Sequence, residues 1–165
     1  HGTYDTDKAE CRDLVVLESP TNAECEKNWI PIEGTNSIVY SWSPLRIGHI
    51  KGEGFSEDAR FETPWLWTHF RGSASPVRVK NESWALVHYV DYTTPRKYYH
   101  VFVALDATTY RPKAMTLPFV FAAMGIEYCL GVRATTNSLE VAYSSWDTDP
   151  CTAEIQMADL EWVQV

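Results

Sequence analysis

The sequence predicts an all-β fold of antiparallel strands, arranged in the manner of a β-propeller. Helical periodicity is scarce, short runs of β-branched and aromatic residues recur between turn signals, and a weak repeat runs along the chain. Strands that follow one another every 8–12 residues or so are typical of sandwiches, barrels and propellers. We expect a single domain over residues 1–165.

The expected strands alternate apolar and polar residues or carry runs of Val, Ile, Tyr, Phe and Trp. Turn signals separate them: "EGTN" at 33–36, "KNES" at 80–83, "TTNS" at 135–138 and "TDP" at 148–150. In chain order, the expected strands cover residues 13–17, 29–33, 37–42, 46–51, 59–63, 75–79, 84–91, 98–105, 114–117, 127–134, 139–146 and 153–160.

The repeat favours a propeller over other β architectures. Its three units cover residues 28–64, 71–118 and 125–165, and their second strands align as "SIVYSWSP", "WALVHYVDY" and "LEVAYSSWD". Repeats of about 45 residues with up to four strands are typical of propeller blades. Because complete propellers carry about four to eight blades, the chain is part of a larger propeller, associates with copies of itself, or forms another β-sandwich or barrel. Open sheet edges invite pairing, so we expect self-association or a larger partner.

Charge and hydropathy exclude several classes of partner. The formal net charge is −8, and Lys and Arg form no cluster along the sequence. Nucleic acids require a positive footprint, so we expect no nucleic-acid partner, and an anionic membrane surface is disfavoured for the same reason. No apolar run approaches the roughly 20 residues of a membrane span. The chain begins at His1 without a signal-like segment, so we expect a processed or excised product.

The cysteines bear on the cellular compartment. Cys11, Cys25, Cys129 and Cys151 are compatible with two disulfides, of which Cys11–Cys25 and Cys129–Cys151 are the simplest pairs. The tripeptide "NES" at 81–83 fits an N-glycosylation acceptor. Together these features favour an extracellular or secretory location.

Residues 65–76, "WLWTHFRGSASP", place large rings beside one arginine and a run of small side chains. Small residues allow a ligand close to the backbone, and the guanidinium of Arg71 offers a planar pair of donors. Trp65 and Trp67 offer flat apolar faces on which a sugar ring stacks. We therefore expect Trp65, Trp67 and Arg71 to bind substrate. The alternative is structural, with a tight corner after Arg71 and Trp67 in the core.

In a propeller, the first strands of the blades line a central channel, which would bring together residues 28–29, 71–73 and 125–127. Glu127 lies in the apolar stretch "AAMGIEYCLG", where desolvation raises the pKa of a carboxylate. A raised pKa suits a glycosidase-type acid or base. The alternative is a buried ion pair, for example with Arg71.

Three further residues are candidates for this channel. His88 and His100 lie within expected strands and are placed to donate to an anion or a sugar hydroxyl, His88 as a catalytic residue and His100 as a substrate-binding one. Asp147 ends the strand "AYSSWDTD" and is the second candidate carboxylate. The alternatives are hydrogen-bonded core histidines and a turn aspartate. No glycine loop, nucleophile elbow or dense His/Cys cluster is present, so we expect no cofactor and no metal.

A family resemblance links these pieces. The order of "RGSASP", "LVHYV", "YYHVFVALD", "IEYCLG" and "YSSWDTD" over residues 71–149 resembles the C-terminal blades of five-bladed propeller carbohydrate enzymes of the β-mannoside phosphorylase and hydrolase family. A second likeness, in "YSWSPLRIG", is to propeller domains attached to glycosyltransferases. The resemblance implies that His88 and Asp147 lie where that family contacts phosphate or the attacking water, and that Glu127 faces the channel. The family's general acid belongs to a segment that this chain does not contain, and Tyr89 replaces a family glycine.

These observations predict a carbohydrate-recognising propeller-type module related to glycan-processing enzymes. One alternative is a glycoside hydrolase, phosphorylase or glycosyltransferase that is active only with further blades or a partner chain. The other is a structural or assembly subunit with an aromatic interaction surface. An enzyme needs two carboxylates about 5–9.5 Å apart, whereas a lectin needs only stacked rings and hydrogen bonds. The test is whether Glu127, His88 and Asp147 meet in one cavity.

Overall fold

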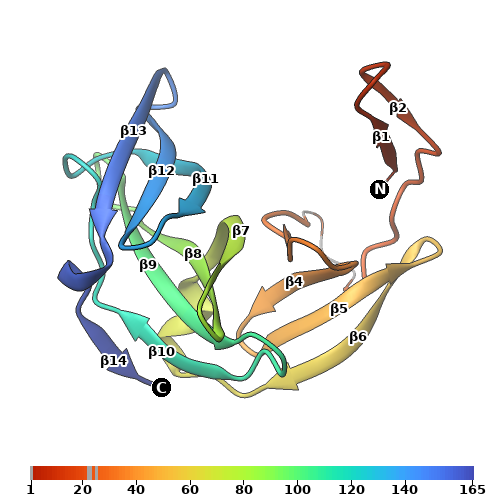
Figure 1. Ribbon diagram of the computed structural model, residues 1–165, viewed down its shortest axis with the longest axis horizontal. Helices are drawn as coiled ribbons and strands as arrows, with labels where there is room; N and C mark the ends of the chain where they lie inside the picture. The colour runs from red at the N-terminus through yellow and green to blue at the C-terminus, as the bar shows by residue number, and fades with distance from the viewer. Residues whose placement is uncertain (1, 22–23, 25) are drawn as a thin grey trace.

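The computed structural model describes residues 2–21, 24 and 26–165, and its regular structure is almost entirely β-strand. All the strand pairs are antiparallel. Figure 1 shows three larger sheets arranged in an arc and a small N-terminal hairpin that stands apart from them. The prediction of an all-β antiparallel fold is confirmed, but the described residues close into neither a barrel nor a complete propeller.

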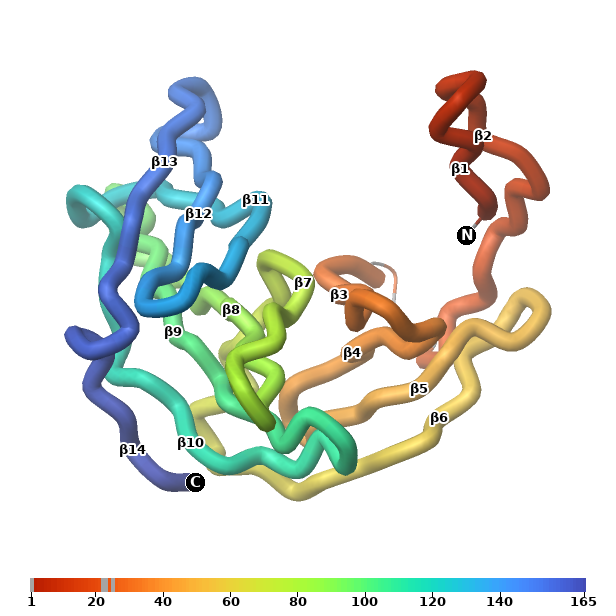
Figure 2. The backbone as a smooth tube through the Cα atoms, in the orientation of Figure 1, coloured from red at the N-terminus to blue at the C-terminus, as the bar shows by residue number. Residues whose placement is uncertain are grey.

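The sheets follow chain order, apart from the last strand. After the β1–β2 hairpin, the spatial orders are β3-β4-β5-β6, then β7-β8-β9-β10-β14, then β11-β12-β13. The path of the chain through them can be followed in Figure 2. The strands are β1 (Thr3–Asp5), β2 (Glu10–Arg12), β3 (Ile30–Pro31), β4 (Ser37–Trp42), β5 (Leu45–Lys51), β6 (Gly54–Phe61), β7 (Arg71–Val79), β8 (Glu82–Asp91), β9 (Lys97–Asp106), β10 (Pro112–Thr116), β11 (Glu127–Ala134), β12 (Ser138–Ser145), β13 (Asp149–Gln156) and β14 (Trp162–Gln164).

The structure corrects the expected strands at both ends of the chain. Residues 13–17 form no strand; they follow the β1–β2 hairpin as a largely exposed segment. The third repeat was expected to reach residue 165, yet β14 pairs with β10 and completes the second sheet. The ring of Trp162 packs against Trp84 at 4.6 Å between centroids, which explains why the chain returns there.

The second sheet is buried on both faces, because it lies between the cores that it forms with the first and third sheets. Along β8, Ala85 and Val87 pack in a cluster with Val39 of the first sheet, whereas Leu86 packs in a cluster with Leu139 of the third. A strand buried on both faces loses the polar half of its alternation. This explains the continuous apolar runs "WALV" and "VFVAL" in the sequence.

Helical structure in the described residues is limited to two short 3₁₀ segments, η1 (Trp65–His69) and η2 (Met157–Asp159). They include no helix with the length and apolarity that crossing a bilayer requires. The segment η1 connects the first sheet to the second, so its side chains lie at the boundary between core and surface.

The expected disulfide between Cys129 and Cys151 does not form, and both side chains are free thiols. Tyr143 on the central strand β12 is the register neighbour of both Cys129 and Cys151, so two strand spacings separate them. That is about 9–10 Å, more than the Cα separation that a disulfide spans. Burial raises the pKa of the Cys129 thiol to about 12, which leaves it unreactive. The expected Cys11–Cys25 pair lies outside the described residues.

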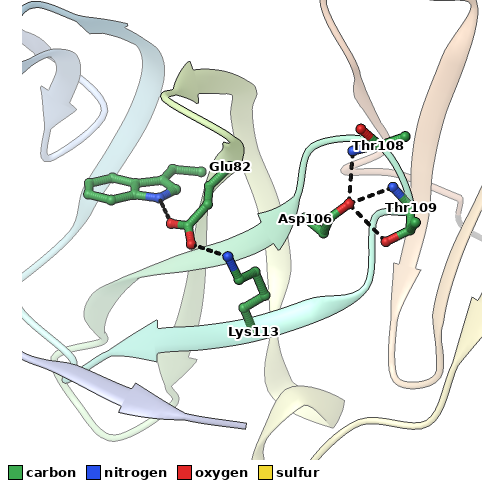
Figure 3. A network of polar contacts seen from close by, with 6 residues as sticks. Glu82, Asp106, Thr108, Thr109 and Lys113 are labelled. Carbon is green, nitrogen blue, oxygen red and sulfur yellow. Dashed lines mark hydrogen bonds and ion pairs between the residues drawn. The ribbon is translucent and has the colours of Figure 1, made fainter.

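Polar contacts tie the strands of the second sheet together at one end (Figure 3). Glu82 accepts the indole N–H of Trp84 at 2.8 Å and pairs with Lys113 of β10 at 2.5 Å. In the turn after β9, Asp106 accepts the main-chain N–H of Thr109 at 2.8 Å, and such main-chain hydrogen bonds lower its pKa. The positive charge of Lys113 is thus paired within the sheet.

Candidate functional site

Three of the predicted site residues form one row across the second sheet. Arg71 on β7 is directly opposite His88 on β8, and His88 is directly opposite His100 on β9. Side chains that face each other across antiparallel strands lie on the same side of the sheet, here the side that packs against the third sheet. Arg71 is exposed, His88 is 4% exposed and His100 is 0% exposed, so the row descends from the surface into the core.

His88 is a neutral, positioned imidazole. Its Nδ1 lies 2.7 Å from the Ser73 hydroxyl oxygen, and its ring makes a T-shaped contact with the Tyr128 ring at 5.3 Å between centroids. Burial, reinforced by the positive charges of Arg71 and Lys27, lowers the pKa of His88 to about 4. At neutral pH this histidine therefore offers a hydrogen bond but no charge.

His100 is a core residue. Neither ring nitrogen has a hydrogen-bond partner among the described residues, and the ring stacks on Phe121 at 4.0 Å between centroids. Nε2 lies 3.9 Å from Glu127, beyond hydrogen-bonding distance. Burial, followed by the charge of His88, lowers the pKa of His100 to about 3. With no exposed surface, His100 cannot contact a substrate as we expected.

Glu127 organises the loop that precedes β11. The side chain is 2% exposed, and its two oxygens accept the main-chain N–H groups of Phe121, Ala122 and Ala123 at 2.7, 2.9 and 3.1 Å. Both carboxylate oxygens are thus occupied by donors from the chain itself. This geometry supports a structural anchor, in place of an acid or base that reaches a glycosidic oxygen.

Replacing Glu127 with glutamine is expected to lower the free energy of unfolding by about 2–4 kcal/mol, because an amide turns one acceptor into a donor that faces main-chain N–H groups. Chemical denaturation of the two proteins measures the difference. Glu154→Gln, on the exposed face of β13, is the control and should change stability by less than about 0.5 kcal/mol. Equal stability of Glu127→Gln and the parent would show that the anchor is unimportant.

Asp147 lies in the exposed turn between β12 and β13. Its φ is 57°, and the turn is closed by the Thr148 N–H, which donates to the Ser145 carbonyl at 3.1 Å. No hydrogen bond or ion pair within the described chain joins Asp147 to His88 or Glu127. One carboxylate is on the surface and the other is enclosed, so the three expected catalytic residues do not meet in a solvent-accessible cavity.

The two tryptophans of η1 face opposite ways. Trp67 is 0% exposed, its indole N–H donates to the sulfur of Met115 at 3.3 Å, and its ring packs against Trp42 and Phe70. Trp65 is 76% exposed, with its ring against His69. The expectation that Trp67 stacks on a sugar is wrong because the core covers both faces of its ring. Trp65 remains accessible.

The small residues after Arg71 serve contacts between strands. The side-chain amide of Asn28 donates to the Gly72 carbonyl at 3.1 Å and to the Tyr128 hydroxyl at 3.5 Å. A Cβ at Gly72 would collide with the main-chain oxygen of Asn28 and with Ile30. The segment before β3 therefore fills the space that we expected a ligand to occupy, and it joins the first strands of all three larger sheets.

An open pocket of about 670 Å³ lies next to this junction, with Arg71 on its wall. Trp29 and Tyr40, both half-buried, line it with their rings 5.3 Å apart. Trp29 belongs to the segment 28–29 that was expected to line the channel, but neither Trp29 nor Tyr40 was expected to bind substrate. Tyr40 lies at a break in the register between β4 and β5, and such bulges redirect a side chain in a way that strand periodicity does not reveal.

Within the described ranges, no group of three or more His, Cys, Asp or Glu side chains is placed to hold a metal ion. Several accessible rings and cations gather around Arg71. Comparison of the chain with protein-family models, with curated proteins and with solved structures finds no match.

Proposed function

We propose that the protein is a carbohydrate-recognising module whose binding site is the open pocket beside Arg71. The observation that carries this proposal is the pairing of two half-exposed rings, Trp29 and Tyr40, with an exposed guanidinium in one pocket. Aromatic rings stack on the apolar faces of sugars, and a guanidinium donates in parallel to paired oxygen acceptors. Pockets of this size with a few convergent polar groups are typical small-molecule sites.

The aromatic wall is held in place before a ligand arrives. The Tyr40 ring stacks on Phe55 at 4.8 Å between centroids, and its hydroxyl donates to the Glu26 carboxylate at 2.9 Å. A ring that is already fixed loses little conformational entropy when a sugar binds. Preorganisation of this kind supports recognition by the pocket as it stands.

The arrangement of the sheets supports a propeller-type module. The first strand of the second sheet, β7, contacts both β3 and β11, the first strands of the other two larger sheets. Adjacent innermost strands are a feature of propeller blades around a common axis. We infer that the missing blades come from another part of a longer chain or from a partner, as the likeness to propeller carbohydrate enzymes implies.

Recognition agrees better with the geometry than catalysis does. Hydrolysis by the usual route requires two carboxylates that flank the scissile bond. Glu127 is enclosed by main-chain donors and Asp147 lies in a surface turn, so neither supports that role.

A comparison of two tryptophan variants tests the proposal. Trp29→Ala is expected to weaken glycan binding about tenfold or more, because it removes a stacking face. Trp65→Ala is the matched control and should leave affinity unchanged, since Trp65 is outside the pocket. A glycan array that includes neutral and acidic sugars identifies a ligand, calorimetry gives the affinities, and circular dichroism verifies that both variants are folded.

Two results would contradict the proposal. The parent protein could bind no glycan on the array, which would exclude carbohydrate recognition by this chain. Alternatively, Trp65→Ala could abolish binding while Trp29→Ala preserves it, which would place the site on η1 and not in the pocket.

A further inference from the structure

The pocket beside Arg71 gathers positive charge in an acidic protein. Four of the 14 Lys and Arg residues of the chain, Lys27, Arg46, Arg60 and Arg71, line this single pocket, although the net charge is −8. The sequence does not reveal the cluster, because the four residues are spread over 45 positions (27 to 71) and four segments of the fold.

Two of these cations face each other directly. Arg46 on β5 and Arg60 on β6 are register partners, so their side chains project from the same face of the first sheet. Like charges directly opposite each other on antiparallel strands are destabilising. Glu57 pairs with Arg46, so Arg60 is the member of this pair whose side chain has no ion-pair partner among the described residues.

Within the described ranges, one of the two arginines has an ion-pair partner. Arg46 pairs with Glu57, and its guanidinium lies over the Tyr40 ring at 4.7 Å. Among the described residues, the side chains of Arg60, Arg71 and Lys27 have no hydrogen-bond or ion-pair partner. Three unpaired cations therefore face one open pocket, next to a fourth that is held rigidly against an aromatic ring.

The carboxylate on the pocket wall does not cancel this charge. Glu26 accepts hydrogen bonds from the hydroxyls of Ser19, Thr21 and Tyr40 at 2.7, 2.7 and 2.9 Å. Partial burial opposes its ionisation, but these hydrogen bonds outweigh burial and lower the pKa of Glu26. These hydroxyl donors hold the Glu26 oxygens against the pocket wall. The three cations with unpaired side chains outnumber this single carboxylate.

We propose that the pocket binds an anionic glycan, with the carboxylate or sulfate group held by Arg60, Arg71 and Lys27 and the sugar ring against Trp29 and Tyr40. This inference rests on the proposed carbohydrate recognition and narrows it to acidic sugars. Guanidinium groups bind planar and tetrahedral oxyanions through paired hydrogen bonds, while the rings contact the uncharged part of the same ligand.

Three probes distinguish the contribution of the anionic group to binding from that of the sugar ring. They are a tetramer of galacturonic acid, the methyl ester of that tetramer, and a sulfated galactose tetramer. In calorimetric titrations, the acid or the sulfated tetramer is expected to bind about tenfold or more tightly than the ester, which keeps the ring and loses the charge. Preference for the acid identifies a carboxylate ligand, and preference for the sulfated form identifies a sulfate ligand. The affinity should fall as NaCl is raised from about 50 to 300 mM.

Variants locate the anion. Arg60→Gln and Arg71→Gln are each expected to weaken binding of the preferred charged tetramer about tenfold and to leave binding of the ester unchanged. Arg133→Gln is the matched control, because Arg133 is an exposed arginine on β11 that pairs with Glu140. It should bind every probe as the parent does.

The outcomes distinguish this inference from the proposed function. Equal affinity for the acid, the sulfated tetramer and the ester would overturn the anionic site and leave recognition of neutral sugars in place. If Arg60→Gln and Arg71→Gln still bind a charged tetramer more tightly than the ester, the anion binds at another site and this assignment is wrong. Failure of the parent to bind any glycan, here and on the array, would overturn the proposed function and this inference together.

Discussion

Lowering the pH from 6.5 to 4 is expected to remove about 5 kcal/mol from the free energy of unfolding through His88 and His100 alone. Both imidazoles are buried in neutral form, and burial lowers their pKa values to about 4 and about 3 from the ordinary value of 6.5. At pH values between 6.5 and each lowered pKa, these histidines bind protons in the unfolded chain but not in the folded protein. The stabilisation is therefore complete above pH 6.5 and is lost progressively as the pH falls.

A variant isolates the contribution of one histidine. His100→Leu keeps the side chain close in volume and removes the titrating group, so the dependence of unfolding free energy on pH should weaken by about 1 kcal/mol per unit between pH 6 and 5. Urea denaturation at several pH values measures this slope, which does not depend on the absolute stability of the variant. His69→Gln, at an exposed position of η1, is the control and should preserve the parent slope.

One outcome of this experiment would contradict the burial of His100. If His100→Leu and the parent lose stability with the same slope, His100 ionises within the folded protein, and its buried position next to His88 and Phe121 would have to be wrong.

Most strands could be predicted because the residue types along a strand depend on whether one or both of its faces are buried. β4 and β11 match their expected bounds, since both carry the β-branched and aromatic residues that favour strands. The runs "WALV" and "VFVAL" were also assigned to strands, although their lack of alternation reflects burial on both faces. Residues 13–17 had the composition of a strand but form none, because composition alone does not decide whether a segment becomes a strand.

The site could be predicted only in part, because burial depends on contacts between distant segments. Arg71, His88 and His100 share a row, yet their exposure falls to zero along it. The loop that carries Phe121 covers His100, and no property of the strand "YYHVF" indicates this. The same limit applies to the pocket beside Arg71, because Arg46 lies opposite Arg60 only through the register of β5 and β6.

Trp67→Ala is expected to lower the free energy of unfolding by about 3–5 kcal/mol, the usual cost of a large cavity in a packed core. The indole is enclosed by Trp42 and Phe70, and its N–H donates to the sulfur of Met115, so no neighbour is free to fill the space. For a chain of this length, the loss corresponds to a decrease in melting temperature of about 10 °C.

Trp65→Ala provides the contrast, two residues away in the same 3₁₀ segment. Its ring is largely in solvent, so the change should be within about 0.5 kcal/mol. At a temperature where all proteins are folded, Trp67→Ala should bind glycans as the parent does, because the core covers its ring. Thermal melts measure the stabilities of the two variants, and calorimetry measures their affinities for glycans. A stable Trp67→Ala protein that has lost glycan affinity would reverse the assignment and place the sugar on Trp67.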